Sequence, residues 1–381
     1  MNMNPKMIFY KRRQETRERS LLSRASWFGL IICLLILAGC QGIPESSVNS
    51  SSGTGTASQA ASSASPTTTG QDNLYHQKAV TWQVEQTWGM WPNTNWTAVE
   101  QDAVDLENAH ITWVRTNFDQ GVSFEYFDRL LQIARQHNIH ILALVMKNDP
   151  PNDIGTQQQR DAYKQWLASA VQRYKSDIHY WEIQDEPNST DGWNIDNDPD
   201  SDQGQFDTSV QHFIADMQDS YETIHATDPN AKVVFGGLSQ YKPARYVDSM
   251  IKYNAYRYMD IMSFHPYGSS PEKVVEELKA LQSQMATQPG FASKPIWVTE
   301  IGYHTMKDWK NNPGYVSSEQ KKAEYLGPTI EGLESAGVQM VFWYTLHEDD
   351  GTNGYGLTVR SAQNPHTVYL PAYTAYKNLW S

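Results

Sequence analysis

From about residue 75 onward, short apolar runs alternate with longer segments in which apolar residues recur every three or four positions. The short runs are rich in β-branched and aromatic residues and predict strands, whereas the longer segments predict amphipathic helices. Eight strands are expected, at Ala79–Val84, Ile111–Asn117, Ile139–Val145, His179–Ile183, Lys232–Gly236, Ile261–His265, Pro295–Glu300 and Met340–Thr345. Helices are expected between them, including Tyr126–Gln136, Asp161–Tyr174, Thr208–Thr227, Pro271–Met285 and Glu319–Ala336.

Strands that alternate with helices build parallel sheets, and eight such units predict a closed barrel rather than an open sheet. The fold class expected for residues 75–381 is therefore α/β, as a (β/α)8 TIM barrel in one domain. No glycine-rich nucleotide-binding motif follows any expected strand, and no internal repeat is present.

The N-terminus has a different pattern. A basic stretch ends near Arg24 and is followed by an almost wholly apolar run, Trp27–Gly39, which is shorter than the ~20 residues that a spanning helix needs. This is typical of a signal peptide over residues 1–39. The closing sequence Leu-Ala-Gly-Cys resembles the lipobox of bacterial lipoproteins, which implies lipidation at Cys40 and an extracytoplasmic location on the cell membrane. An ordinary secretory signal, or a membrane anchor with an incidental cysteine, is the alternative.

Residues 40–74 follow the signal and are rich in Ser, Thr, Gly and Ala. This composition buries too little apolar area to offset chain entropy, so a flexible linker is expected. The only two cysteines, Cys33 and Cys40, lie in the N-terminal segment, which excludes disulfides, thiolate zinc sites and cysteine nucleophiles from the barrel.

The charge of the chain limits its partners. The net charge is -13, and because residues 1–39 carry seven Lys/Arg and two Glu, the remainder carries -18. Such a surface disfavours nucleic acid and anionic substrates. We expect a carbohydrate-binding monomer without a cofactor.

Polar residues gather at the carboxyl ends of the expected strands, where TIM barrels carry their chemistry. Glu186 follows the fourth strand and Glu300 ends the seventh. Two carboxylates on facing strands can supply the acid and the nucleophile that glycoside cleavage needs. Glu182 and Gln184 precede Glu186 by even steps, so we expect them in a polar layer inside the barrel.

The segments around these two residues resemble a known family. Trp-Glu-Ile-Gln-Asp-Glu-Pro-Asn, ending at Asn188, and Ile-Trp-Val-Thr-Glu-Ile-Gly, ending at Gly302, are similar to the strand-four and strand-seven motifs of clan A retaining glycoside hydrolases. The pattern looks closest to family 39, with family 5 next. The resemblance implies that Glu186 is the acid/base and Glu300 the nucleophile of a retaining β-glycosidase.

The same resemblance implies roles for four further residues. Arg115 would steady the nucleophile through charge pairing, and Tyr267 would donate a hydrogen bond to it. His265 would lie near the nucleophile, and Trp343 would form the floor of a sugar subsite.

Asp185 departs from the family pattern, which has Asn before the acid/base, where the amide donates to the sugar 2-hydroxyl. A carboxylate accepts from that hydroxyl but cannot donate. A different group at C2, a shifted pH optimum and weak activity are all open interpretations.

Several weaker candidates flank the site. Glu85 and Trp88, after the first strand, are candidate substrate contacts, and loop packing is the alternative for Trp88 and for Trp91. The acidic loop over 191–202 vaguely resembles a calcium loop without its glycine, and a solvated loop is the simpler interpretation. No motif for a catalytic metal is present, so no metal is expected.

Two other functions stay open. One is a carbohydrate-binding barrel that has lost activity, for which Asp185 in place of Asn would be the sign of decay. The other is a transglycosylase that remodels an exopolysaccharide. The sequence does not identify the sugar or the linkage. The resemblance to family 39 implies xylosides, uronides or an exopolysaccharide, and the expected anchor favours endo action on a polymer.

Overall fold

The computed structural model describes residues 74–89, 92–147, 155–188, 203–240, 243–348, 354–360 and 367–381. The expected signal peptide, the lipidation site Cys40, the linker up to Asn73, Trp91 and the acidic loop lie outside these residues. In the described part of the chain, no helix is both long and apolar enough to cross a membrane.

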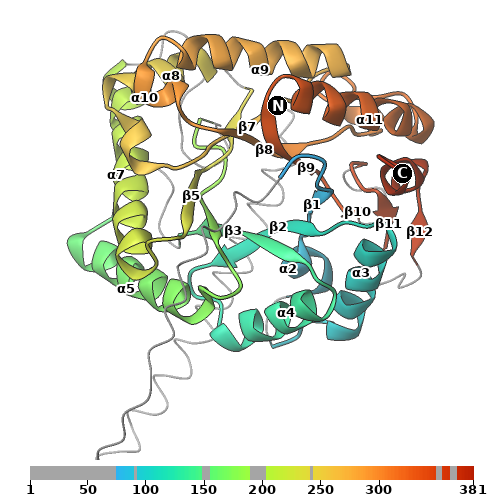
Figure 1. Cartoon of the computed structure of the whole chain (residues 1–381), viewed down its shortest axis with the longest axis horizontal. Helices are drawn as coiled ribbons and strands as arrows, with labels where there is room; N and C mark the ends of the chain where they lie inside the picture. Colours follow the sequence, from blue (N-terminus) through green and yellow to red (C-terminus); the bar gives the residue numbers. More distant parts are fainter. Residues whose placement is uncertain are drawn as a thin grey trace, which may run out of the picture. The chain divides into compact units, whose positions relative to one another are not determined.

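The expected TIM barrel is confirmed (Figure 1). All eight predicted strands are present, with ends that differ by a few residues. They are β1 Ala79–Thr81, β2 Trp113–Asp119, β3 His140–Met146, β4 Tyr180–Ile183, β5 Lys232–Phe235, β7 Met262–His265, β8 Ile296–Ile301 and β9 Val338–Trp343. A short strand, β6 (Leu238–Ser239), extends the line of β5 and pairs with β7.

Strand pairing is parallel and follows the order of the chain around the barrel. The sheet runs β5-β4-β3-β2-β1-β9-β8-β7-β6, so the first strand pairs with the last. A bridge between Val234 and Ile261 joins β5 to the start of β7 and closes the ring. Parallel strands that close in this way bring all eight carboxyl ends to one mouth.

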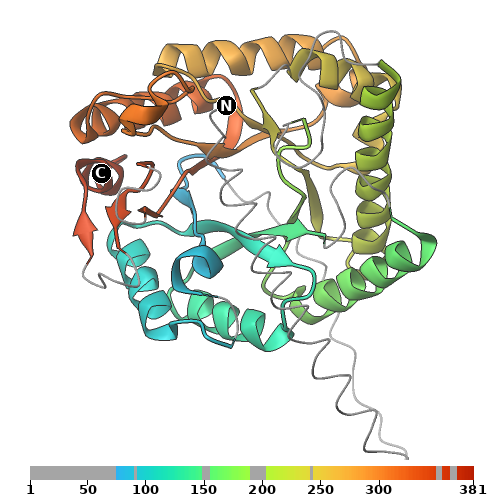
Figure 2. The same cartoon turned by 180° about the vertical axis from the view of Figure 1, so that it is seen from behind.

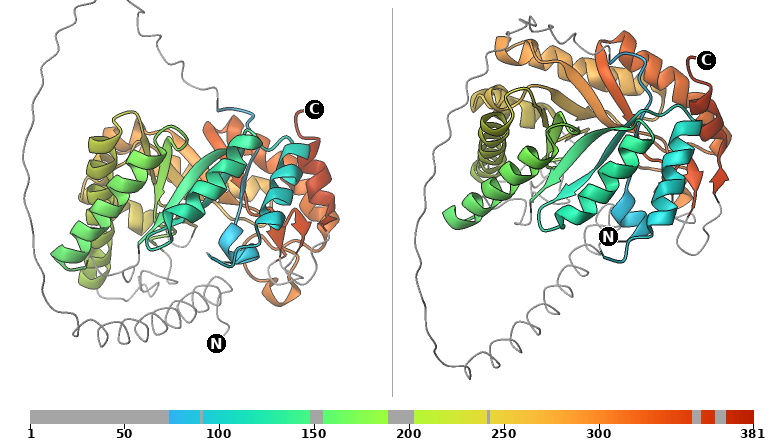
Figure 3. Two further views of the ribbon diagram at one scale, coloured as in Figure 1. Left: turned by 90° about the horizontal axis from the view of Figure 1, so that it is seen from below. Right: turned by 60° about the horizontal axis from the view of Figure 1, so that its bottom comes forward.

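Helices cover the outside of the strands, as the views in Figures 1 and 2 and the side views in Figure 3 show. Their apolar faces pack on the outward side chains of the sheet. The larger ones are α3 Trp96–Asn108, α4 Phe124–Gln136, α5 Gln157–Tyr174, α7 Gln203–Thr227, α8 Pro243–Lys252, α9 Pro271–Met285, α11 Glu319–Ser335 and α12 Pro371–Lys377. The shorter ones are α2 Val84–Trp88, α10 Pro289–Ala292 and 3-10 turns at Ala255–Tyr258 and Lys307–Trp309.

Local sequence explains several helix starts. Thr156 forms a capping box with Gln159, and Ser270 caps α9, which has a proline in its first turn. The helix α2 was not predicted. It begins at Val84, where the sequence predicts the end of a strand, so Glu85 lies on a helix and not at a strand end. Three two-residue strands, β10 His347–Glu348, β11 Thr358–Val359 and β12 Val368–Tyr369, form a second small sheet.

The interior of the barrel is layered. Its lower part is apolar and contains one cluster that includes Ala79, Trp113, Val234, Trp297 and Phe342, all less than 9% exposed. Side chains two positions further along the strands also face inward, because strand residues alternate between two faces. They are polar and build the next layer, Arg115, Glu182, Ser263 and Thr299. This agrees with the polar layer predicted for Glu182.

Candidate active site

Arg115 on β2 is the centre of the polar layer. Its Nε donates to Glu182 Oε2 at 2.6 Å, its Nη2 to Asp185 Oδ1 at 2.6 Å, and its Nη1 to Glu300 Oε2 at 3.2 Å. Burial by itself would lower the pKa of Arg115, but the charges of these three carboxylates raise it well above its usual value. One guanidinium therefore holds carboxylates from β4, from the segment after β4, and from β8.

Glu300 reaches the mouth through a β-bulge in β8. The three-residue step from Val298 to Ile301 pairs with a two-residue step on β9, so β8 contains one extra residue. Val298 and Ile301 pack in the outer core, and the two residues between them, Thr299 and Glu300, both make contacts inside the barrel. A regular strand would turn one of the two outward.

Tyr267, two residues beyond β7, donates from its hydroxyl to Glu300 Oε1 at 2.7 Å. Burial raises the pKa of Tyr267 well above its usual value, and the charge of Glu300 adds to the rise. Tyr267 is therefore a protonated donor at neutral pH, and both oxygens of Glu300 are hydrogen-bonded.

Glu186 lies three residues after β4 and is 6% exposed. Its backbone has a positive φ of 43°, and Gln184 has one of 63°, so the alternation of strand faces ends at Ile183. The carboxyl Oε1 of Glu186 lies 3.0 Å from His265 Nδ1. His265 is the last residue of β7, is fully buried, and contacts Thr299 Oγ1 at 3.0 Å through Nε2.

A glycine makes room for this imidazole. A Cβ on Gly237, between β5 and β6, would lie 2.0 Å from His265 Nε2. The backbone N–H of Gly237 also donates to Glu182 Oε1 at 3.2 Å. Neither Gly237 nor Thr299 was singled out from the sequence, because neither carries chemistry of its own.

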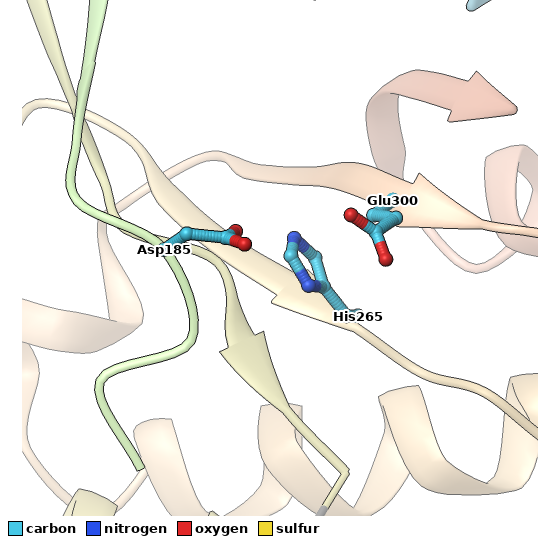
Figure 4. Close-up of side chains that lie close together, drawn as sticks. All are labelled: Asp185, His265 and Glu300. Atoms are coloured by element: carbon cyan, nitrogen blue, oxygen red, sulfur yellow. The ribbon is translucent and has the colours of Figure 1, made fainter. Parts of the chain in front are cut away.

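Asp185, His265 and Glu300 point toward one another (Figure 4). Each offers a potential metal-ligand atom, and these atoms lie within 4.8 Å of one another; no other such group occurs among the residues that the structure describes. Both ring nitrogens of His265 already have partners, and the guanidinium of Arg115 contacts both carboxylates. These contacts favour a hydrogen-bonded cluster over a cation site.

The placement of Trp343 corrects a prediction. Trp343 is fully buried in the outer core, where its ring centroid lies 6.0 Å from that of Tyr303. Phe342 takes the inward position on β9, so the next inward residue is Tyr344. The Tyr344 ring contacts that of Tyr355 at 5.3 Å, and Tyr344 Oη accepts a hydrogen bond from Gln83. Tyr344, and not Trp343, is therefore the inward aromatic residue at the carboxyl end of β9.

The candidates near β1 lie apart from this cluster. Trp88 is 3% exposed, its indole N–H donates to Asp102, and Arg360 lies 4.9 Å from its ring, so the structure favours the packing interpretation. Glu85 is buried on α2. Burial of Tyr126 raises the pKa of its hydroxyl, and the charges of Glu85 and Asp119 add to this rise. Asp119 ends β2, two residues beyond the predicted strand end.

One family model matches part of the sequence. Residues 193–369 match the family model described as "Glycosyl hydrolase catalytic core". No curated protein matches the chain.

Three solved enzymes share the fold. A family 39 glycoside hydrolase from Bacteroides cellulosilyticus WH2 has a TM-score of 0.59 at 17% identity, over 80% of this chain and 63% of its own. A family 39 enzyme from Xanthomonas axonopodis pv. citri has a TM-score of 0.58 at 15% identity, and the match covers 80% of this chain and 66% of that enzyme. A monomeric beta-xylosidase from Caulobacter crescentus CB15 has a TM-score of 0.58 at 15% identity, and the match covers 79% of this chain and 67% of that enzyme. The chain spans less than two thirds of the length of the first two. Its barrel is therefore similar in fold to those of these glycoside hydrolases, and residues 193–369 have the sequence pattern of a glycosyl hydrolase catalytic core.

Proposed function

We propose that this protein is a glycoside hydrolase that cleaves a β-glycosidic bond with retention of configuration. Glu300 is the nucleophile and Glu186 the general acid/base. The observation that carries the proposal is the contrast between their surroundings. Glu300 is held by Arg115 and Tyr267, both donors, which stabilise a carboxylate. Glu186 contacts an imidazole that can exchange a proton with it.

Each step of a double displacement has a residue at hand. Glu300 attacks the anomeric carbon and forms a glycosyl ester, while Glu186 protonates the leaving oxygen. Glu186 then takes a proton from water, which attacks the ester and restores Glu300. Retaining enzymes need carboxyl groups about 5–5.5 Å apart. Glu186 contacts His265, and a His265 ring nitrogen lies within 4.8 Å of a Glu300 oxygen, so both carboxyl groups lie beside the same imidazole.

Azide rescue tests both assignments. With a dinitrophenyl glycoside, Glu186→Ala should form the glycosyl ester but hydrolyse it slowly, and added azide should restore turnover and yield the β-glycosyl azide. Glu300→Ala should yield the α-azide instead, because azide then enters from the opposite face. Glu331→Gln on the exposed side of α11 is the matched control and should behave as wild type. A first-formed wild-type product of inverted configuration, read by proton NMR, would contradict the mechanism.

We also propose that the enzyme acts outside the cytoplasm, anchored by a lipid on Cys40. The lipobox-like sequence and the linker of residues 40–74 support this. In a bacterial host fed labelled palmitate, the wild-type chain should carry the label and sediment with membranes. Cys40→Ser should lose both properties while keeping its hydrolytic activity. Label retained by Cys40→Ser would overturn the anchor.

A further inference from the structure

The buried hydrogen-bond chain behind Glu186 determines where its proton lies. Glu182 is an acceptor in its contacts with Arg115 and with the backbone N–H of Gly237. Thr299 Oγ1 donates to Glu182 Oε1 at 2.8 Å. A hydroxyl has one proton, so Thr299 can only accept from its other neighbour.

That neighbour is His265, whose Nε2 lies 3.0 Å from Thr299 Oγ1. The Nε2 atom must therefore carry a proton. In a neutral imidazole, Nδ1 is then an acceptor, and the 3.0 Å contact with Glu186 Oε1 requires a protonated Glu186. If the imidazole is charged instead, Nδ1 donates to a Glu186 carboxylate. In both cases one proton lies between His265 and Glu186.

We propose that Thr299 is a positioning residue that keeps the acid proton between His265 and Glu186, available to Glu186, by holding a proton on His265 Nε2. This inference rests on the proposed role of Glu186. Removal of the shared proton would leave the Nδ1 lone pair facing a Glu186 carboxylate, which is unfavourable. The alternative tautomer, with the proton on Nδ1, would relieve this but would abandon the contact with Thr299. The chain therefore delays the loss of the acid proton as pH rises.

Among the described residues, the charged and titratable groups near this pair are Arg115, Glu182, Asp185, Tyr267 and Glu300. Arg115 on β2 binds Glu182, Asp185 and Glu300, and Tyr267 donates to Glu300. Oxygens of Asp185 and Glu300 lie within 4.8 Å of a His265 ring nitrogen, and both are held by Arg115. None of these contacts passes through the Thr299 hydroxyl, so a change at Thr299 removes the contact with His265 and the hydrogen bond to Glu182 and leaves the others in place.

The test is the pH dependence of kcat/KM for a glycoside with a poor leaving group, which needs the acid. In Thr299→Val, valine has nearly the same shape as threonine but offers no hydrogen-bond acceptor. His265 can then carry its proton on Nδ1, which faces Glu186, instead of on Nε2. The basic limb should then move at least about one pH unit lower, the equivalent of one hydrogen bond to a charged group. Thr299→Ser should keep the wild-type profile. An unmoved limb in Thr299→Val, or an equal shift in Thr299→Ser, would overturn the proposal.

A direct measurement covers the case in which Thr299→Val folds poorly. In wild-type protein labelled with 15N-histidine, long-range correlation spectra distinguish protonated from unprotonated ring nitrogens, and His265→Gln identifies the signal. We expect Nε2 to stay protonated across the active pH range, and a signal from the Nδ1–H tautomer would refute the assignment. If instead Glu186→Ala cleaves poor leaving groups at the wild-type rate, the proposed function fails while the tautomer can still be read.

Discussion

The hydroxyl of Tyr267 and the carboxylate of Glu300 lie 2.7 Å apart across the mouth of the barrel, and the tyrosine is the donor. Tyr267→Phe removes this hydrogen bond and leaves Glu300 with Arg115. A hydrogen bond to a charged group contributes about 1.5–3 kcal/mol, so kcat should fall about 10–100-fold. Steady-state kinetics of the glycosylation step measure this. Tyr325→Phe on α11 is the control, and a Tyr267→Phe rate equal to wild type would exclude a role for the hydroxyl in the chemistry.

Asp185 should make the enzyme sensitive to the group at C2 of the sugar. The carboxylate is held by Arg115, and its side chain is 27% exposed, against 2% for Glu300. Because it lies close to Glu300, the substituent next to the anomeric carbon would meet it, and a carboxylate only accepts. A 2-hydroxyl or 2-ammonium glycoside should exceed its 2-deoxy analogue by about tenfold or more in kcat/KM.

Asp185→Asn is the matched variant for this comparison. An amide can donate as well as accept, so it should reduce the preference for an ammonium group at C2 and tolerate an acceptor there. Equal kcat/KM values for all C2 substituents in the wild type would show that Asp185 does not contact this position.

Substitutions at the neighbouring residues Trp343 and Tyr344 should have different effects: the first should lower stability, and the second should weaken substrate binding. Tyr344→Ala removes an aromatic ring from the mouth and should raise KM about 2–10-fold, in line with 0.5–1.5 kcal/mol for one aromatic contact. Trp343→Phe leaves a gap in the outer core and should lower the free energy of unfolding by roughly 1–3 kcal/mol with KM unchanged. Urea unfolding and initial rates on both variants check this, and the reverse pattern would place Trp343 at the sugar.

His304 should make the fold sensitive to acid. It is fully buried, and neither ring nitrogen has a hydrogen-bond partner among the described residues. Burial, and then the charge of Lys322, lowers the pKa of His304 to about 4. Between that value and the ~6.5 of an unfolded histidine, the unfolded chain binds more protons. Stability should therefore fall as pH decreases from about 6.5 to about 4.

His304→Phe should remove this component, which amounts to roughly 3 kcal/mol over the whole window. The measurement is urea unfolding at several pH values between 4 and 7. His179→Gln, at an exposed position, is the control and should keep the wild-type slope. A His304→Phe variant with the same slope would locate the acid sensitivity elsewhere.

The barrel could be predicted because the sheet is parallel and its strands are buried on both sides, which leaves short apolar runs between helices. The positions of Glu186 and Glu300 followed from their place at strand ends. The small sheet of β10, β11 and β12 was missed, since two-residue strands give no periodic pattern.

Local backbone geometry limited how well the sequence could predict which side chains face the mouth of the barrel. The alternation of faces fails where a bulge or a positive φ intervenes, and a one-residue error then moves a side chain to the other face. Trp343 was placed at the mouth through its resemblance to the strand-eight tryptophan of the family, whereas Phe342 takes the inward position on β9 and Tyr344 is the next inward residue. The bulge in β8 is the reason that the inward turn of both Thr299 and Glu300 could not be read from spacing.

Because of the extra residue in β8, two consecutive side chains, Thr299 and Glu300, face inward and make different contacts. Thr299 joins the chain that leads to Glu182, whereas Glu300 is held at the mouth by Arg115 and Tyr267. A side chain at position 300 can therefore change without dismantling the support beneath it. Loss of that one residue from the strand would leave a single inward position for both side chains, so a stable barrel could lack the carboxylate that we propose as the nucleophile.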